Sequence, residues 1–481
     1  MRYYNQLIFD LSRKDRIGYH IKKKNLPDVH LPKDRLRPHP ALLPEVSEFD
    51  VVRHYTNVSQ KNFGVETGFY PLGSCTMKYN PKINDELATL PGFLNIHPLQ
   101  PEETIQGVLK IYYETQAMLS EISGLKAYSL NPFAGAHGEL AGLMIIKAYH
   151  EKNNDFKRTK IIIPDSAHGT NPASATVCGF DTVEIKSNPD GTVNLEALRA
   201  VLNDEVAGLM LTNPNTAGVF EKDILEISNM VHEVGGLLYY DGANLNALLG
   251  ISRPGDMGFD ITHINLHKTF STPHGGGGPG SGPVGVCEKL VEFLPNPVVK
   301  KENDRYYFDK ALDSIGTLGQ FFGNAGVYIR AYVYLLTLGK EGLCKVGAYA
   351  VLNANYIKES LKDLFELPIK GHCMHEFVYD GLIDTSTGVK TLDIAKRLLD
   401  YGFHAPTVYF PLIFSQSMMI EPTEVESKET LDAFIDVLRK VANEAIEDPE
   451  MVKTAPHHTL VRRLDEAKAA RQPIVKYRDL F

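Results

Sequence analysis

The sequence predicts an α/β protein with a mainly parallel sheet flanked by helices, followed by a smaller C-terminal α+β domain. Short apolar runs alternate with helical patterns between residues 160 and 288, an order typical of βαβ units. After about residue 366 the spacing of apolar runs and helical patterns changes, which favours a separate domain. A chain of 481 residues is also too long for one compact core.

Each element follows from a local pattern. Apolar runs predict strands at 160–164, 206–212, 237–241, 261–266 and 282–288. Helical patterns lie at 105–122, 195–202, 224–234, 319–338, 341–364, 391–401 and 427–447. We therefore expect an N-terminal arm over 1–95, a large domain over 96–335, a small domain over 336–450 and a charged tail over 451–481.

Composition narrows the class of protein. Hydrophobic residues make up 43% and charged residues 23%, with a net charge of −9, so nothing favours binding to nucleic acid or to an anionic membrane. The N-terminal segment does not resemble a signal peptide, and no apolar run is long enough to span a bilayer. The five cysteines form no CxxC pair, which disfavours a disulfide framework or a zinc ribbon. A cytoplasmic enzyme is the expectation.

Polar or ionisable residues follow four of the predicted strands. DSAHGTNPASA follows the first, NPNTAG the second, Asp241 ends the third, and His267 and Lys268 follow the fourth. Ligands of open α/β sheets bind at the carboxyl ends of the strands. The four strand ends therefore predict a functional site at one edge of the sheet.

Lys268 is the first candidate in this site. Most lysines lie on the surface, but this one stands between an apolar strand and HGGGGPGSGP, where little side-chain bulk surrounds it. A desolvated lysine with a lowered pKa is a Schiff-base nucleophile, and glycines let the backbone approach a planar ligand. Asp241 has an alternative interpretation as a turn residue, yet beside such a lysine it suits the acidic partner of a pyridine nitrogen, as in PLP sites.

Two weaker signals complete the pattern. Gly135, Ala136 and His137 precede a helical run, where free backbone N–H groups could bind a phosphate. His168 could stack on a planar ring, although a lone histidine is more often structural. The glycine run lacks the GK[ST] ending of a P-loop and opens no helix. His263, His267 and His274 lack the spacing of a metal site, so none is expected.

With these residues in place, the sequence resembles the glycine-cleavage P-protein family, glycine decarboxylase (aminomethyl-transferring), among the fold-type I PLP-dependent transferases. The matching segments are LGSCTMKYNP, GAHGELAGL, IPDSAHGTNPASA, LTNPNTAGVFE, YYDGANLNA and HINLHKTFSTPHGGGGPGSGPVGV. The length resembles the second, lysine-bearing subunit of the split two-subunit form. Ala134 and His137 depart from the serine and glutamine that many relatives have at these positions.

The resemblance implies a role for each site residue. Lys268 would bind pyridoxal 5′-phosphate as a Schiff base, Asp241 would face the pyridine nitrogen, and His168 and Ala243 would pack on the two faces of the ring. The backbone N–H groups of Ala134, Gly135 and Ala136 would bind the phosphate. The side chain of His267 would lie beside the phosphate and the Schiff base.

The resemblance also implies the reaction and its partners. Glycine would lose CO2, and its aminomethyl group would pass to the lipoyl arm of H-protein, with P-protein subunit 1 completing a heterotetramer of two dimers. The residues alone do not separate this reaction from that of an aminotransferase or a carbon–sulfur lyase. A subunit without catalytic activity is disfavoured because Lys268 and Asp241 are both present. Cys75, in the arm, could be a redox or substrate-channel residue, but a small buried residue is the favoured interpretation.

Overall fold

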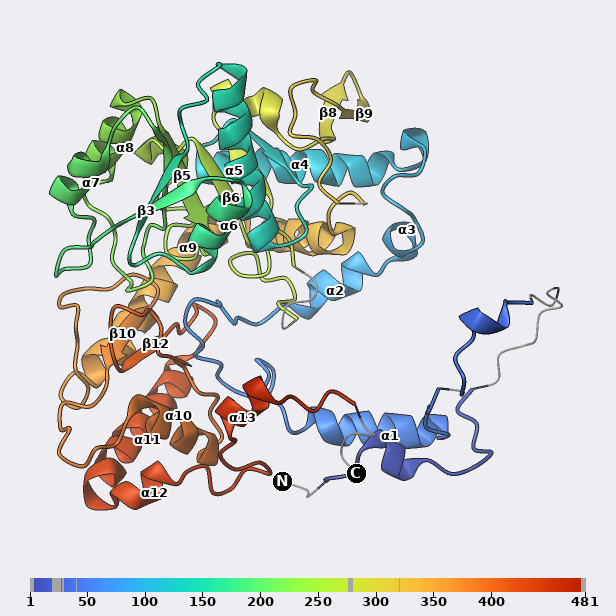
Figure 1. Ribbon diagram of the computed structural model, residues 1–481, viewed down its shortest axis with the longest axis vertical. Coiled ribbons are helices and arrows are strands. Elements are labelled where there is room, and N and C mark those ends of the chain that lie inside the picture. Colours follow the sequence, from blue (N-terminus) through green and yellow to red (C-terminus); the bar gives the residue numbers. More distant parts are fainter. Residues whose placement is uncertain are drawn as a thin grey trace. The chain divides into compact units, whose positions relative to one another are not determined.

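The computed structural model describes residues 4–19, 27, 30–39, 41–275, 280–319 and 321–476 (Figure 1). Residues 276–279 of the predicted glycine turn lie outside the described residues. The chain divides into two compact units. The first comprises the described parts of 1–67 and 458–481, and contains η1 (Ile8–Leu11), η2 (Lys33–Arg35), α1 (Glu48–Ser59) and α13 (Glu466–Arg471). The second, Gly68–His457, contains every residue of the predicted site.

A seven-stranded sheet forms the centre of the second unit, in the order β1-β7-β6-β5-β4-β2-β3. Its strands are β1 (Ala127–Ser129), β2 (Lys160–Pro164), β3 (Asp181–Ile185), β4 (Val206–Leu211), β5 (Leu237–Gly242), β6 (Ile261–Ile264) and β7 (Val284–Val286). Neighbours from β3 to β6 are parallel, whereas β7 is antiparallel to both β6 and β1. The prediction of a mainly parallel sheet is confirmed.

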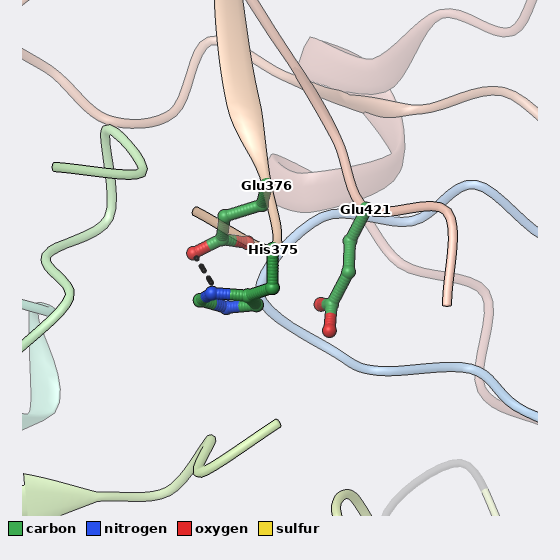
Figure 2. A group of neighbouring side chains, drawn as sticks. All are labelled: His375, Glu376 and Glu421. Carbon is green, nitrogen blue, oxygen red and sulfur yellow. Dashed lines mark ion pairs between the residues drawn. The ribbon is translucent and has the colours of Figure 1, made fainter. Parts of the chain in front are cut away.

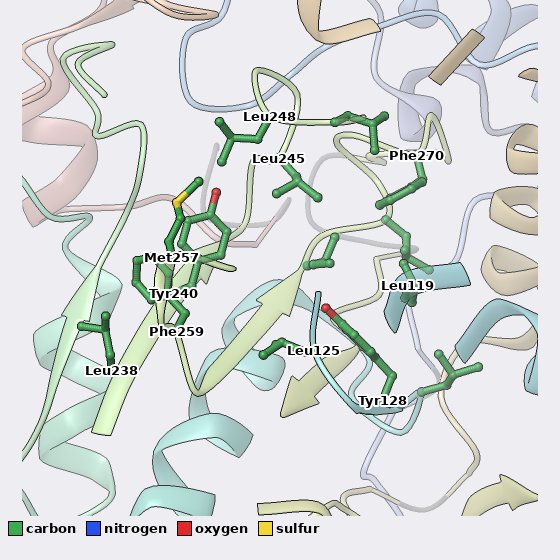
Figure 3. Close-up of a cluster of buried hydrophobic side chains, with 14 of the residues drawn as sticks. Leu119, Leu125, Tyr128, Leu238, Tyr240, Leu245, Leu248, Met257, Phe259 and Phe270 are labelled. Carbon is green, nitrogen blue, oxygen red and sulfur yellow. The ribbon is translucent and has the colours of Figure 1, made fainter. Parts of the chain in front are cut away.

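Helices cover both faces of this sheet (Figure 1). They are α4 (Gln106–Ser123), α5 (Gly135–Lys152), α6 (Thr170–Val177), α7 (Leu195–Val201), α8 (Ile224–Glu233) and the start of α9 (Ala325–Ser360). Alternation along β5 separates two cores: Leu237 and Tyr239 pack in the cluster that includes α5, whereas Leu238 and Tyr240 pack in the cluster that includes α4 (Figure 3). By the same alternation, Asp241 lies on the α5 side.

A smaller α+β domain follows, as predicted. It contains β10 (Phe377–Asp380), β11 (Thr407–Val408) and β12 (Ser417–Ile420) in the order β10-β12-β11, with α10 (Thr391–Asp400), α11 (Lys428–Glu447) and α12 (Pro449–Lys453). The two helices predicted at 319–338 and 341–364 meet in α9, which is interrupted at Gly339 (φ 58°, ψ −175°). The first begins at Ala325 because Gly319 and Gly323 adopt positive φ.

Short or exposed elements escaped the sequence patterns. They include β1, the edge strand β3, which is mostly exposed, and the hairpin β8 (Val298–Glu302) and β9 (Arg305–Asp309). Others are α2 (Lys82–Ala88), α3 (Pro91–Leu94), η3 (Glu102–Thr104), η4 (Pro254–Met257) and η5 (Glu288–Phe293). None of the helices among the described residues is both long and apolar enough to cross a membrane.

Candidate active site

One cavity is lined by residues from all four strand ends that the sequence singles out. Its empty space, including the part that is open to solvent, is about 640 Å³. Residues at or just after the carboxyl ends of β2, β4, β5 and β6 line it: His168, Thr170, Thr212, Pro214, Thr216, Asp241, Ala243, Asn244, Asn265 and Lys268. The other lining residues come from the arm, from α5, from β6 and from the smaller domain: Ser74, Gly135, Ala136, Glu139, His263, His375 and Glu376.

Lys268 lies just after β6, and its amine is held by the arm. Its Nζ donates a hydrogen bond to the backbone oxygen of Ser74 at 2.7 Å. Cys75 follows in the same segment and is half-buried, and burial raises the pKa of its thiol. A protonated thiol is a poor nucleophile, which disfavours Cys75 for covalent chemistry.

The arm segment next to Lys268 has an unfavourable backbone conformation. Ser74 and Thr76 adopt φ of 66° and 47°, in a region that costs energy for residues other than glycine. Two acids of the smaller domain hold it: Glu376 accepts from the Ser74 N–H at 2.8 Å, and Glu421 accepts from the Thr76 N–H at 2.9 Å. The segment is thus fixed between the lysine and the smaller domain.

Asp241 is the penultimate residue of β5 and is only 4% exposed. Its Oδ2 accepts from Asn171 Nδ2 at 3.0 Å, and its Oδ1 accepts from the Ala243 N–H at 3.1 Å. Burial raises the pKa of this carboxyl, but the nearby His263 and these two hydrogen bonds lower the pKa by more, so it lies below its usual value. Asp241 is therefore an anion at neutral pH, in the cavity that contains Lys268.

Two buried side chains support this anion. His263 stands directly opposite Asp241 in the β5–β6 register, with its Nε2 3.6 Å from Asp241 Oδ1 and its Nδ1 2.6 Å from the hydroxyl of Tyr239. Burial lowers the pKa of His263, so its ring carries one proton. The carboxylate favours that proton on Nε2, and Tyr239 then donates to Nδ1. Sequence reasoning treated His263 only as a possible metal ligand, although its place in the strand beside Asp241 was a usable signal.

The N-terminus of α5 opens into the cavity through Gly135 and Ala136. The first N–H groups of a helix have no partner within it. Packing here is tight, because a Cβ at Gly135 would lie 2.3 Å from Asn265 Oδ1. Ala134 is the N-cap residue and lies outside the lining, and His137 accepts at Nδ1 from the Phe133 N–H at 3.2 Å.

The two remaining predicted histidines differ in position. His168 lines the cavity and its Nδ1 lies 2.8 Å from Thr170 Oγ1; burial lowers the pKa of its imidazole. His267 lies outside the lining and accepts at Nδ1 from the Ser281 N–H at 3.3 Å. Burial lowers the pKa of His267 to about 3, so it is neutral.

Glu139, on α5, is a lining residue that sequence reasoning missed. It is 2% exposed, its Oε2 accepts from Thr170 Oγ1 at 3.0 Å, and its Oε1 has no hydrogen-bond partner. Burial, together with the charge of Asp241, raises the pKa of Glu139 to about 7. The sequence signal that could have identified Glu139 was its position one turn after the start of a helix whose first residues are small.

The smaller domain contributes a second group that the sequence did not reveal. His375, Glu376 and Glu421 are buried, and each offers a polar atom within 4.8 Å of the others (Figure 2). Burial and the charge of Glu421 raise the pKa of Glu376 well above its usual value, whereas burial lowers the pKa of His375. No motif marks this group, because its members lie more than 100 residues beyond Lys268 and belong to another domain.

Comparisons with known proteins show the family of this chain. The family described as glycine cleavage system P-protein matches residues 14–308, and the C-terminal domain of glycine dehydrogenase matches residues 346–462. Proteins named probable glycine dehydrogenase (decarboxylating) subunit 2 are similar over almost the whole chain. The one from Caldanaerobacter subterraneus subsp. tengcongensis is 62% identical over 484 residues, 99% of each chain. The one from Alkaliphilus oremlandii is 62% identical over 479 residues, 98% of each chain.

A solved structure confirms the fold. The crystal structure of glycine decarboxylase (P-protein) of the glycine cleavage system, in inhibitor-bound form, aligns with a TM-score of 0.73 and 22% identity, covering 86% of this chain and 93% of that one. The architecture is therefore that of the fold-type I PLP-dependent enzymes, as the resemblance implies. The chain belongs to the glycine cleavage system P-protein family.

Proposed function

We propose that this chain is the catalytic, PLP-binding subunit of a glycine decarboxylase. It releases CO2 from glycine and transfers the aminomethyl group to the lipoyl arm of H-protein, acting with P-protein subunit 1 in a heterotetramer of two dimers. The observation that carries the proposal is the pairing of Lys268 with the anionic Asp241 in one cavity. Relatives that are 62% identical over nearly the full chain are named for this decarboxylation.

The cavity suits a polar cofactor. Several of its lining side chains have buried polar atoms without a hydrogen-bond partner: Glu139 Oε1, Thr212 Oγ1, Asn265 Oδ1 and both ring nitrogens of His375. Unpaired buried polar atoms are costly, so a ligand that supplies partners would stabilise the cavity. An amine, a buried carboxylate and a helix N-terminus match the aldehyde, the pyridine nitrogen and the phosphate of PLP.

Each predicted residue then has a defined task. Lys268 would bind the aldehyde carbon, and Asp241 would keep the pyridine nitrogen protonated. His168 and Ala243 would contact the faces of the ring. The backbone N–H groups of Ala134, Gly135 and Ala136 would bind the phosphate, with the neutral His267 beside it.

The chemistry divides between cofactor and protein. PLP, when bound, supplies an electron sink for the pair of electrons released as CO2 leaves. Asp241 maintains its charge through Asn171, Ala243 and His263. The backbone oxygen of Ser74 retains the Lys268 amine in the cavity by hydrogen bonding, where it can take up or return a proton when the amino group of glycine replaces it.

The test begins with the absorption spectrum. Purified protein supplied with PLP should absorb at about 420 nm, and Lys268→Ala should abolish that band. Lys147→Ala is a matched control, because Lys147 also donates to a backbone oxygen, that of Cys178 at 3.0 Å, but lies outside the lining. A wild-type protein without the band would refute the proposal.

A second assay identifies the reaction. Exchange of labelled bicarbonate into the carboxyl group of glycine should require this chain together with H-protein and the companion subunit. Amino-group transfer to a keto acid, or release of a thiol, would identify an aminotransferase or a carbon–sulfur lyase instead. Full activity of this chain alone would contradict the split-subunit proposal.

A further inference from the structure

His375 is a buried histidine whose ring nitrogens have no hydrogen-bond partner. It is 2% exposed, and neither Nδ1 nor Nε2 is paired; Glu376 Oε1 lies 3.5 Å from Nε2, which is too long for a good hydrogen bond. The other buried histidines in the described part of the chain, His54, His150 and His263, each have a partner. His375 alone among them is open to a ligand.

The acids around His375 are already engaged. Glu421 accepts from the N–H and the hydroxyl of Thr76, at 2.9 and 2.6 Å, and from Asn244 Nδ2 at 2.8 Å. Glu376 accepts from the Ser74 N–H at 2.8 Å. Figure 2 shows the imidazole between these two carboxyl groups. Of the three side chains, only the imidazole therefore lacks a hydrogen-bond partner, although its Nε2 lies 3.5 Å from Glu376 Oε1, the ion pair drawn in Figure 2.

The donor set disfavours a metal ion at this position. The oxygens of Glu421 are occupied as acceptors, and burial together with the charge of Glu421 raises the pKa of Glu376, so that it favours a proton over a cation. Lys268 lines the same cavity and would repel a cation. A neutral imidazole with a free N–H, next to a lysine, is better suited to an acceptor such as a carboxylate.

The proposed substrate needs such a group. When the amino group of glycine takes the place of the Lys268 amine, the carboxylate lies one carbon away. Lys268 is the only lysine or arginine among the described residues that line the cavity, so no guanidinium is present to bind the carboxylate. An unpaired, uncharged donor among the lining residues is therefore a candidate to bind it.

We propose that His375 binds the carboxylate of the amino-acid substrate through a neutral N–H group. This inference rests on the proposed function, because it takes the position of the amino group from it. As the bond between the α-carbon and the carboxylate breaks, its electron pair stays with the carbon, neutral CO2 leaves, and the imidazole keeps its proton. An interaction that stabilises the carboxylate of the ground state more than the transition state slows this step. A neutral donor stabilises the carboxylate less than an arginine would, so it slows the step less.

The test measures binding by the change in visible spectrum of the PLP-loaded protein titrated with glycine or with methylamine, which lacks a carboxylate. His375→Ala should weaken glycine binding about 10–100-fold, the range for a hydrogen bond to a charged group, and leave methylamine binding unchanged. His375→Asn, which keeps an N–H donor, should restore part of the glycine affinity. His150→Asn is the control, because His150 is buried but pairs with the Ala207 oxygen.

Each outcome separates the possibilities. Equal weakening of both ligands would assign His375 a structural role and overturn the inference, as would glycine binding that is unchanged in both variants. A stoichiometric metal ion in wild-type protein that His375→Ala loses would also overturn it. Absence of the band near about 420 nm in wild-type protein refutes the proposed function itself, whereas a normal band with unchanged glycine affinity in His375→Ala refutes only this inference.

Discussion

Asp241→Asn tests the electrostatic centre of the site with little disturbance of the fold. The asparagine can keep the hydrogen bond from the Ala243 N–H. Its new Nδ2 donor meets Asn171, whose Oδ1 has no partner, so a rotation of that amide restores the second hydrogen bond. We therefore expect the free energy of unfolding to change by about 1 kcal/mol or less.

The effect on function should be far larger. A unit charge at about 4 Å from its partner, at an effective dielectric constant of about 20, contributes about 4 kcal/mol. Losing that stabilisation of a protonated pyridine nitrogen corresponds to about three orders of magnitude in the rate of CO2 release. Part of the loss should also appear as weaker retention of PLP, measured by dialysis of the loaded protein.

The control is Asp260→Asn, since Asp260 is an equally buried carboxylate in the large domain that pairs with His232 and Lys289 away from the cavity. It should leave PLP affinity and bicarbonate exchange unchanged, whatever it does to stability. An Asp241→Asn protein that folds and exchanges bicarbonate within about tenfold of wild type would refute the electrostatic reasoning.

Three further substitutions probe the same cavity. Gly135→Ala would place a Cβ 2.3 Å from Asn265 Oδ1, so it should lower the free energy of unfolding by about 1–3 kcal/mol and weaken PLP binding. An unchanged thermal unfolding curve and an unchanged PLP titration would contradict this close packing. Tyr239→Phe leaves Nδ1 of His263 unpaired and should cost about 1–3 kcal/mol in urea unfolding, whereas a neutral result would mean that this hydrogen bond adds nothing. The pKa of Glu139 rises from 4.5 in the unfolded chain to about 7 in the folded protein. As the pH rises through that interval, the unfolded chain ionises first, so the ionisation of Glu139 lowers the free energy of unfolding. The Glu139→Gln protein without PLP should therefore gain stability relative to wild type between about pH 5 and 8, on the order of 3 kcal/mol, and a difference independent of pH would exclude the assignment.

Strands buried on both sides were predictable because they are nearly continuous apolar runs. The segments KIIIP and VAGLML are examples, and both became central strands of the sheet. The edge strand DTVEI was not predictable in this way, because four of its five residues are not buried and it alternates weakly. The break in α9 was visible because Gly339 interrupts the helical pattern.

The site was predictable only in part, for a physical reason. Asp241 lies at the carboxyl end of β5 and Lys268 follows the neighbouring parallel strand β6, and the carboxyl ends of parallel strands meet at one edge of a sheet. His375 and Glu376 reach the same cavity from a different domain, and that contact depends on tertiary packing, which leaves no periodic signal in the sequence. Glu139 was hidden because helical patterns report apolar faces, not a single acid on them.

Ser74 explains why the arm, the sheet and the smaller domain must form together. Its backbone oxygen accepts from Lys268, and its N–H donates to Glu376, so one polar group of this residue is bound to the sheet domain and the other to the smaller domain. A positive φ of 66° is unfavourable unless such contacts compensate for it. The conformation of Ser74 therefore depends on both domains being in place, and the position of the lysine amine depends on Ser74. Among the described residues, the only hydrogen bond of the Lys268 amine is to Ser74. The amine is therefore held in the cavity when the segment that contains Ser74 is docked, which couples its availability to the completion of the fold.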